Sequence, residues 1–184
     1  IVNISMNEGD LKNMVYVKRA SQDKPLITIV TVVYNGVKYL ENTILSIVNQ
    51  TYNNIEYIII DGGSTDGTLE IIRKYDKAIS YWVSESDGGI SDAFNEAIKV
   101  STGSYINFQG DGDQFYNNAV VENIVEGIDV DNDILISGKI IRTDEVGNTL
   151  YISKQSKYFS KKSLLFKMSL PHQGLFTHRY FFEK

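Results

Sequence analysis

Apolar residues in the first three quarters of the chain follow two alternating patterns. Short β-branched runs have the composition of strands buried on both faces, and the stretches between them have apolar residues at helical spacing. The predicted strands are 26–33, 55–60, 79–83, 105–108 and 134–141, and the predicted helices are 39–49, 67–74, 90–100 and 119–126. This alternation predicts right-handed βαβ units, and therefore an α/β fold with a mostly parallel sheet flanked by helices.

The pattern is weaker toward both ends. Residues 1–24 are polar with scattered apolar positions, and we interpret them as a leader segment with a short helix over 11–17. After position 141 we expect a hairpin turn over 142–149, a short strand over 151–153 and a short helix over 161–167. Because the sequence starts at Ile1 rather than Met and stops without a terminating signal, we expect a fragment of a longer polypeptide.

Composition narrows the classes of function. With 42% apolar residues, the 184 residues suffice for one α/β domain with a core. Asp and Glu outnumber Lys and Arg by 23 to 18 without a dense basic run, which argues against a nucleic-acid partner. With no cysteine and only two histidines, thiolate sites are excluded and any metal should be a hard ion held by oxygen ligands. The sequence contains neither an apolar run of membrane-spanning length nor a signal-peptide pattern.

Polar side chains gather at the predicted carboxyl ends of the strands, where ligands bind in open α/β sheets. They are Thr31, Tyr34 and Asn35 after the first strand, Asp61 after the second, Glu85 and Asp87 after the third, and Asp111 and Asp113 after the fourth. Several also have a purely structural interpretation. Asn35-Gly36 can simply form a turn, Asp61 can cap the turn that follows it, and Asp66 can be the N-cap of the helix through position 74. Together they predict one cleft lined with carboxylates.

Asp111-Gly112-Asp113 is the pair of acids that most strongly indicates a ligand. Two like charges this close cost energy unless a cation or hydrogen-bond donors neutralise them. An EF-hand loop starting at Asp111 does not fit, because Phe115 replaces a ligand and Tyr116 replaces the required glycine. No Walker-type or Gly-x-Gly-x-x-Gly loop occurs, so the better interpretation is a divalent ion that bridges to a diphosphate.

Four stretches of the chain, in their order and spacing, resemble family-2 glycosyltransferases with the GT-A fold. They are ITIVTVVYNGVKYLENTILSIVNQTY, IEYIIIDGGSTDGT, WVSESDGGISDAFNEAIKVSTGSYINFQGDGD and LPHQGLFTHRYFFEK. More narrowly, the chain resembles the bacterial subgroup that assembles capsular, exopolysaccharide and lipopolysaccharide sugars. The resemblance implies that residues 25–184 form a Rossmann-like, nucleotide-sugar-binding GT-A domain, truncated at its carboxyl end and incomplete on the acceptor side.

The resemblance also implies roles for the residues after the first two strands. Thr31, Tyr34 and Asn35 resemble the wall that contacts the nucleotide base. Asp61 resembles the carboxylate that recognises the base, commonly uracil.

Further positions resemble the part of the family site that faces the sugar and the phosphates. Asp87 and Asp92 resemble positions facing the donor, and Asn95 is similar or is simply a packing residue. Asp111 resembles the acid near the ribose, and Asp113 resembles the direct ligand of Mg²⁺ or Mn²⁺. Many relatives carry two adjacent acids here, so the assignment of the metal ligand between Asp111 and Asp113 stays open.

The carboxyl-terminal stretch both matches and departs from the family. His172 and Gln173 match a His-Gln pair near the donor phosphate or the acceptor, although His172 is also consistent with a hydrogen-bonded loop histidine. Gly88 stands where a basic residue is frequent. The family's general base lies beyond the His-Gln pair, and no acid before Lys184 matches it, since Glu183 resembles the edge of a helix.

The implied reaction is transfer of a sugar, with inversion, from a nucleoside diphosphate sugar such as a UDP-hexose. The acceptor would be the hydroxyl of a saccharide or lipid-linked saccharide in cell-surface polysaccharide biosynthesis, in the cytoplasm or at the inner membrane surface. A sugar nucleotidyltransferase would need a Gly- and Arg/Lys-rich loop, which residues 34–38 do not supply. The missing base keeps open a second alternative, a non-catalytic nucleotide-sugar-binding or interaction module of a larger synthase.

Overall fold

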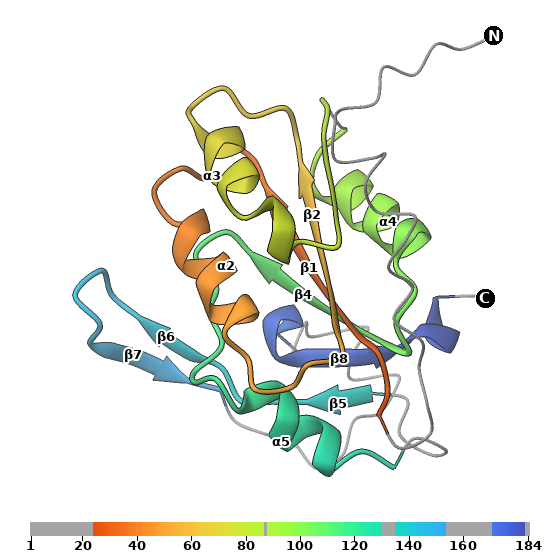
Figure 1. The fold of residues 1–184 in the computed structure, drawn as a ribbon. Helices are drawn as coiled ribbons and strands as arrows, with labels where there is room; N and C mark the ends of the chain where they lie inside the picture. The colour runs from red at the N-terminus through yellow and green to blue at the C-terminus, as the bar shows by residue number, and fades with distance from the viewer. Residues whose placement is uncertain (1–23, 87, 130–134, 154–170, 183–184) are drawn as a thin grey trace, which may run out of the picture.

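The computed structural model describes residues 24–86, 88–129, 135–153 and 171–182. Their main sheet has six strands in the order β3-β2-β1-β4-β8-β5 (Figure 1). The parallel strands β1 (Ile27–Val33), β2 (Ile55–Asp61), β3 (Tyr81–Ser84) and β4 (Tyr105–Gly110) form one side of the sheet. On the other side β8 (Leu175–His178) runs antiparallel to β4, and β5 (Leu135–Ser137) runs antiparallel to β8. Because β2 and β4 flank β1 on opposite sides, the topological switch point lies between β1 and β4.

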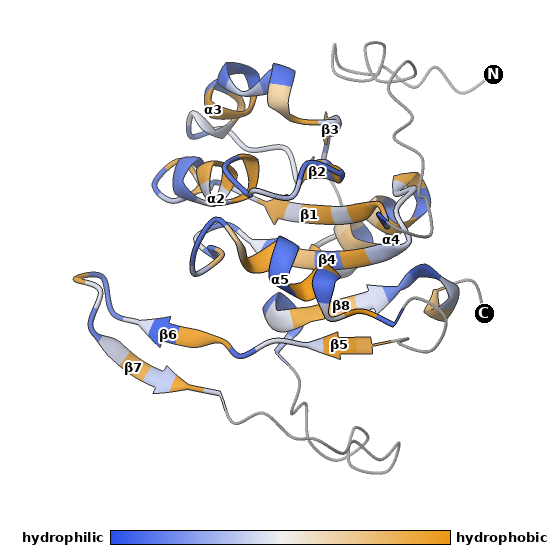
Figure 2. Cartoon of the chain, turned by 60° about the horizontal axis from the view of Figure 1, so that its bottom comes forward, coloured by the Kyte–Doolittle hydropathy of each residue, from blue (hydrophilic) through white to orange (hydrophobic). Residues whose placement is uncertain are grey.

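Helices cover both faces of this sheet. α2 (Leu40–Val48), α3 (Thr68–Lys74) and α5 (Val120–Glu126) lie on one face, and α4 (Ile90–Val100) lies on the other (Figures 1 and 2). Alternate residues of β1 enter the two cores: Ile27 and Ile29 pack with α2, whereas Val30 and Val32 pack with α4. This burial on both faces explains why the strand is an unbroken apolar run.

The parallel half of the sheet confirms the predicted α/β architecture, with modest shifts at the element ends. β4 runs two residues past its predicted end, to Gly110. β3 begins two residues later than predicted, because a short 3₁₀ helix, Asp76–Ala78, precedes it. Trp82 in β3 donates its indole N–H to Asp76 at 2.9 Å, which joins the two elements.

The region after α5 differs more from the prediction. The single strand predicted over 134–141 is wrong, since β5 ends at Ser137 and β6 (Ile141–Thr143) belongs to a separate ribbon with β7 (Thr149–Ile152). The predicted hairpin turn connects these two ribbon strands. β8 was not predicted at all, yet it joins β4 to β5 within the main sheet.

Two helix caps are not the residues that the sequence pattern favours. Asp66 was expected to be the N-cap of α3, but the N-cap is Gly67, with φ at 103°. Asp66 precedes this cap by one residue, and its carboxylate accepts the Thr68 N–H at 3.1 Å. The helix α4 ends at Val100 as predicted, but its C-cap is Ser101 rather than Gly103, the glycine that lies just beyond its end in the sequence. A Cβ on Gly103 would lie 2.8 Å from the Leu26 carbonyl oxygen, so glycine is needed there for close packing against β1.

The helices predicted over 11–17 and 161–167 lie outside the described residues. Of the helices within the described ranges, none combines the length and apolar character that a bilayer crossing requires.

Candidate functional site

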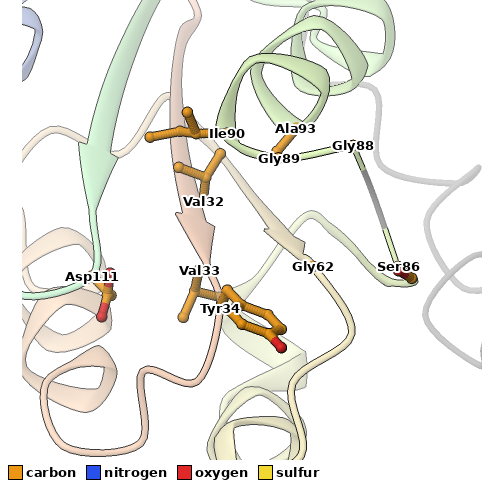
Figure 3. Close-up of a pocket in the computed structure, with 10 residues that line it drawn as sticks. All are labelled: Val32, Val33, Tyr34, Gly62, Ser86, Gly88, Gly89, Ile90, Ala93 and Asp111. Atoms are coloured by element: carbon orange, nitrogen blue, oxygen red, sulfur yellow. The ribbon is translucent and has the colours of Figure 1, made fainter.

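A cavity of about 610 Å³ opens at the carboxyl ends of the parallel strands, beside the topological switch point. Its walls come from the end of β1, the turn after β2, the segment leading into α4, and the turn after β4 (Figure 3). The lining residues are Val32, Val33, Tyr34, Gly62, Ser86, Gly88, Gly89, Ile90, Ala93 and Asp111. No Lys or Arg is among these lining residues, so an anionic ligand would need another source of positive charge.

The three candidates from the end of β1 occupy different positions. Tyr34 is 66% exposed and lines the cavity. Asn35, at φ 53°, accepts the Thr65 N–H on its side-chain oxygen at 3.0 Å and so joins the turns after β1 and β2. Thr31 is fully buried, and its hydroxyl shares a hydrogen bond of 3.0 Å with the Tyr57 hydroxyl. Of the three, therefore, the structure brings only Tyr34 to the cavity.

Asp61 is fully buried behind the cavity wall. Its carboxylate accepts hydrogen bonds from the amides of Gly63 (3.2 Å) and Ser64 (2.9 Å) and from the hydroxyls of Ser64 and Ser84 (2.5 Å for Ser84). Such donors are what a buried carboxylate needs in place of water. Asp61 thus shapes the turn whose Gly62 lines the cavity, and its contact with a base stays a prediction.

The acidic turn after β4 lies at the edge of the cavity. Asp111 is exposed and lies beside Gly36 of the β1 turn, where an added Cβ would be 2.9 Å from its carboxylate oxygen. Gly112 adopts φ 93°, which turns the chain sharply between the two acids. Asp113 accepts the Gly110 N–H at 2.8 Å on one carboxylate oxygen.

This turn suits a divalent cation. Although Asp111 is exposed as a residue, partial desolvation of its carboxyl raises the pKa above its ordinary value, and the charges of Asp113 and Asp66 raise it further. Among the residues that the structure describes, no three His, Cys, Asp or Glu side chains gather as a metal-ligand set. Two carboxylates fit an ion such as Mg²⁺, which is usually held by one or two carboxylates together with substrate phosphates. Asp111 and Asp113 are therefore the residues that could hold it.

The predicted His-Gln pair lies next to the acidic turn. It forms a short 3₁₀ helix, His172–Gly174, just before β8. The side-chain amide of Gln173 donates to Oδ1 of Asp113, the carboxylate oxygen that Gly110 does not use, at 3.5 Å. The two residues are 60 positions apart in the sequence. The exposed His172 ring meets the edge of Phe94 in α4, with 6.0 Å between ring centroids.

Two buried amides in β4 hold this segment, and sequence reasoning missed both. Asn107 donates to the carbonyl oxygens of Gln173 (3.0 Å) and Leu175 (2.8 Å). Gln109 donates to the Asn107 side-chain oxygen (2.7 Å) and to the Gln173 carbonyl oxygen (2.9 Å). The signal was available: Asn107 is a polar residue within the predicted strand 105–108, and Gln109 is the next residue on the same face of the observed strand.

The start of α4 contributes two glycines and the apolar side chains of Ile90 and Ala93 rather than the predicted acids (Figure 3). Gly88, Gly89 and Ile90 line the cavity, whereas Asp92 is exposed in the first helical turn and is absent from the lining. Its carboxylate lies over Gly88, so any side chain at position 88 would force it to move. Asp87 lies outside the described residues.

Residues 28–182 match the model of glycosyl transferase family 2. An uncharacterized glycosyltransferase of Haemophilus influenzae is 35% identical over 144 residues, which cover 77% of this chain and 57% of that protein. Another, from Rickettsia typhi, is 34% identical over 142 residues, which cover 76% of this chain and 44% of that protein. The chain thus spans about half the length of these relatives.

Solved structures show the same fold. Staphylococcus aureus TarS 1–349 in complex with UDP-GlcNAc aligns at a TM-score of 0.54 and 24% identity, over 59% of this chain and 32% of that one. The mannosyltransferase PcManGT from Pyrobaculum calidifontis, in complex with GDP-Man and Mn²⁺, aligns at 0.59 and 22% identity, over 65% and 36%. Both likenesses support a GT-A architecture. With a family match that runs from β1 through β8, the chain belongs to glycosyl transferase family 2.

Proposed function

We propose that this chain binds the nucleoside diphosphate sugar of a metal-dependent glycosyltransferase in the cavity, with Mg²⁺ or Mn²⁺ held by Asp111 and Asp113. The observation that carries the proposal is the meeting of the acidic turn and Gln173 beside a cavity without cationic lining residues. A diphosphate placed there needs a cation to neutralise it, and two acids at the edge can hold one. TarS and PcManGT were solved with ligands of this kind.

The proposed reaction transfers a hexose to an acceptor hydroxyl with inversion. Tyr34 and the backbone around Gly62 and Gly89 would form the walls that hold the donor in a fixed orientation. Bound at Asp111 and Asp113, the ion would supply Lewis-acid stabilisation of the departing diphosphate. A general base must take the proton from the acceptor hydroxyl. Residues 174–182 contain no Asp or Glu, so we place this base elsewhere in the protein.

The finer assignment is a UDP-hexose donor and a saccharide or lipid-linked saccharide acceptor in bacterial cell-surface polysaccharide biosynthesis. The resemblance of the quoted motifs to that subgroup supports it. Nucleotide sugars are made in the cytoplasm, so we place the reaction there, at the inner membrane surface when the acceptor is lipid-linked. We also propose the division into a leader, 1–24, and a donor-binding domain, 25–184, which a family match starting at residue 28 supports.

Calorimetric titration of the chain with UDP and with GDP, each with and without Mn²⁺, tests donor binding. We expect heat that depends on Mn²⁺, with UDP at least ~10-fold tighter than GDP, a difference of about 1.4 kcal/mol. The absence of Mn²⁺-dependent heat with both nucleotides would contradict the proposed site. Tighter binding of GDP would overturn the uridine assignment alone.

The alternative is a non-catalytic nucleotide-sugar-binding or interaction module, and the lack of a carboxylate in residues 174–182 favours it. The full-length polypeptide that contains this chain separates the two. Acceptor-dependent release of nucleoside diphosphate would show a transferase, whereas donor binding without such release would show a binding module.

A further inference from the structure

The two buried amides of β4, Asn107 and Gln109, are energetically unfavourable residues in a strand core unless they are hydrogen-bonded. Asn107 is fully buried and Gln109 is 3% exposed, and both share a face of β4 with Tyr105 because alternate residues point the same way. A buried amide is tolerated only when its polar atoms are hydrogen-bonded, whereas an apolar side chain carries no such requirement. Their presence therefore calls for a specific partner.

That partner is the His-Gln turn, the short 3₁₀ helix His172–Gly174 that precedes β8. All four side-chain N–H groups of the two amides are used, three of them on the carbonyl oxygens of Gln173 and Leu175. The fourth, from Gln109, goes to the Asn107 oxygen and fixes which way the Asn107 amide faces. Asn107 and Gln109 thus direct their other three donors at a single segment of the chain.

The backbone explains why side chains are needed here. β8 pairs with β4 only at Tyr105↔His178 and Ile106↔Thr177, so the backbone ladder ends before the turn is reached. Asn107 and Gln109 are the next positions on the Tyr105 face of β4, and their side chains reach the carbonyl oxygens of Gln173 and Leu175 where the ladder has ended. From the other side, Gly138 donates its N–H to the Gly174 carbonyl oxygen at 2.7 Å.

We infer that Asn107 and Gln109 are positioning residues, which hold the His172–Gln173 turn so that the Gln173 side chain lies against Asp113. This inference rests on the proposed function, because Asp113 is there a metal ligand. Asn107 and Gln109 both donate to the backbone carbonyl oxygen of Gln173. The side-chain amide of the same residue reaches the Asp113 carboxylate at 3.5 Å. A residue partnering a metal-binding carboxylate orients it and affects metal affinity.

Asn107→Leu removes the donors and the acceptor while it keeps the number and branching of the side-chain heavy atoms. We expect it to weaken Mn²⁺-dependent binding of UDP about 10-fold, measured by calorimetry, as is typical for loss of support around a metal ligand. The matched control is Tyr52→Phe, since the buried Tyr52 hydroxyl donates to the Pro25 carbonyl oxygen at 2.6 Å and lines a different cavity. It should lower the melting temperature and leave UDP affinity unchanged.

A double variant separates positioning from general support of the fold. In a His172→Ala/Gln173→Ala background, Asn107→Leu should change UDP affinity less than about twofold, because the side chains that it positions are already gone. An equal loss of affinity in both backgrounds, or none in the wild-type background, would overturn the inference. If Asn107→Leu does not fold, Gln109→Met takes its place in the same cycle.

The same titrations distinguish the two proposals. Mn²⁺-dependent UDP binding by the wild-type chain, with no change in Asn107→Leu, leaves the donor site standing and rejects the positioning role. Wild-type chain that binds no UDP in the presence of Mn²⁺ rejects both.

Discussion

The two sides of the cavity are stabilised in different ways. On the β1–β2 side, the turns of consecutive βα units are joined directly, with the Asn35 and Gly36 amides donating to the hydroxyls of Ser64 (2.7 Å) and Thr68 (2.9 Å). On the β4 side, the acidic turn meets a segment 60 residues later through one contact of 3.5 Å and the buried amides beneath it.

This difference predicts where stability and ligand affinity can be separated. A turn network around a buried carboxylate should fail as a unit, because each lost acceptor leaves buried donors unpaired. After β4, Asp111 is exposed and Asp113 is half-buried, and both carry few internal hydrogen bonds, so their removal should alter binding with little effect on folding. Four substitutions test this contrast, in decreasing order of expected effect.

Asp61→Ala should give the largest loss, about 3–5 kcal/mol in the free energy of unfolding, because it removes a buried carboxylate that accepts four hydrogen bonds. Urea denaturation monitored through Trp82 measures it. The control is Asp66→Ala, an exposed acid near the same turn, which should cost about 1 kcal/mol or less. Similar losses for both variants would show that the β1–β2 side does not depend on Asp61.

Asp113→Ala should weaken Mn²⁺-dependent UDP binding about 100-fold or more, since it removes a proposed metal ligand, whereas loss of a residue that only supports a ligand costs about 10–100-fold. Calorimetry measures the affinity, and the melting temperature should fall by only a few degrees. Asp144→Ala removes the same charge from the exposed ribbon turn, outside the lining of the cavity, and should leave affinity unchanged. Unchanged affinity in Asp113→Ala refutes its role.

Gly36→Ala connects the two sides, because the new Cβ would lie 2.5 Å from Val33 Cγ2 and 2.9 Å from the Asp111 carboxylate. We expect about 1 kcal/mol of lost stability from overpacking. Displacement of Asp111 should also weaken Mn²⁺-dependent UDP binding, by roughly 3–10-fold, well below the effect of losing a ligand. Gly147→Ala is the stability-matched control, since it introduces strain at φ 92° with no atom within 4 Å. Equal affinity in the two variants would contradict a role for Asp111.

Lys38→Ala should give the smallest effect. Lys38 and Glu145 are 3.4 Å apart, with side chains 66% and 82% exposed, so their contribution is screened by water. We expect about 0.5 kcal/mol or less in stability and no more than a twofold change in UDP affinity. A larger loss of affinity would mean that the β6–β7 ribbon, which Glu145 joins to the rest of the chain, takes part in donor binding.

Local pattern was enough to predict the β1–β4 half of the molecule. Strand and helix periods are set by which face of each element is buried, and that burial is recorded in neighbouring residues. Parallel connection then requires that the strand ends, with Tyr34, Asp61 and Asp111, meet at one edge of the sheet. The helix over Ile90–Val100 was predicted at its observed bounds for the same reason.

The other half depended on pairings that local pattern does not encode. Residues 134–141 are apolar enough for one strand, but the Gly138–Gly174 backbone contact and the insertion of β8 decide where β5 stops. Asp61 and Asp111 look alike as strand-end acids, yet one is enclosed by hydroxyls from β3 and its own turn while the other faces the cavity.

The sequence by itself therefore determined the fold class, the order of the first four strands and helices, and the edge at which a ligand can bind. Only the tertiary structure decided which of the strand-end acids lies at the cavity and which is buried, and that Asn107 and Gln109 hold the His-Gln turn against β4. The physical reason is distance along the chain. Periodicity is a local property and shows which face of an element is buried, whereas Asn107 finds its hydrogen-bond partner Gln173, 66 residues away, only when the sheet assembles.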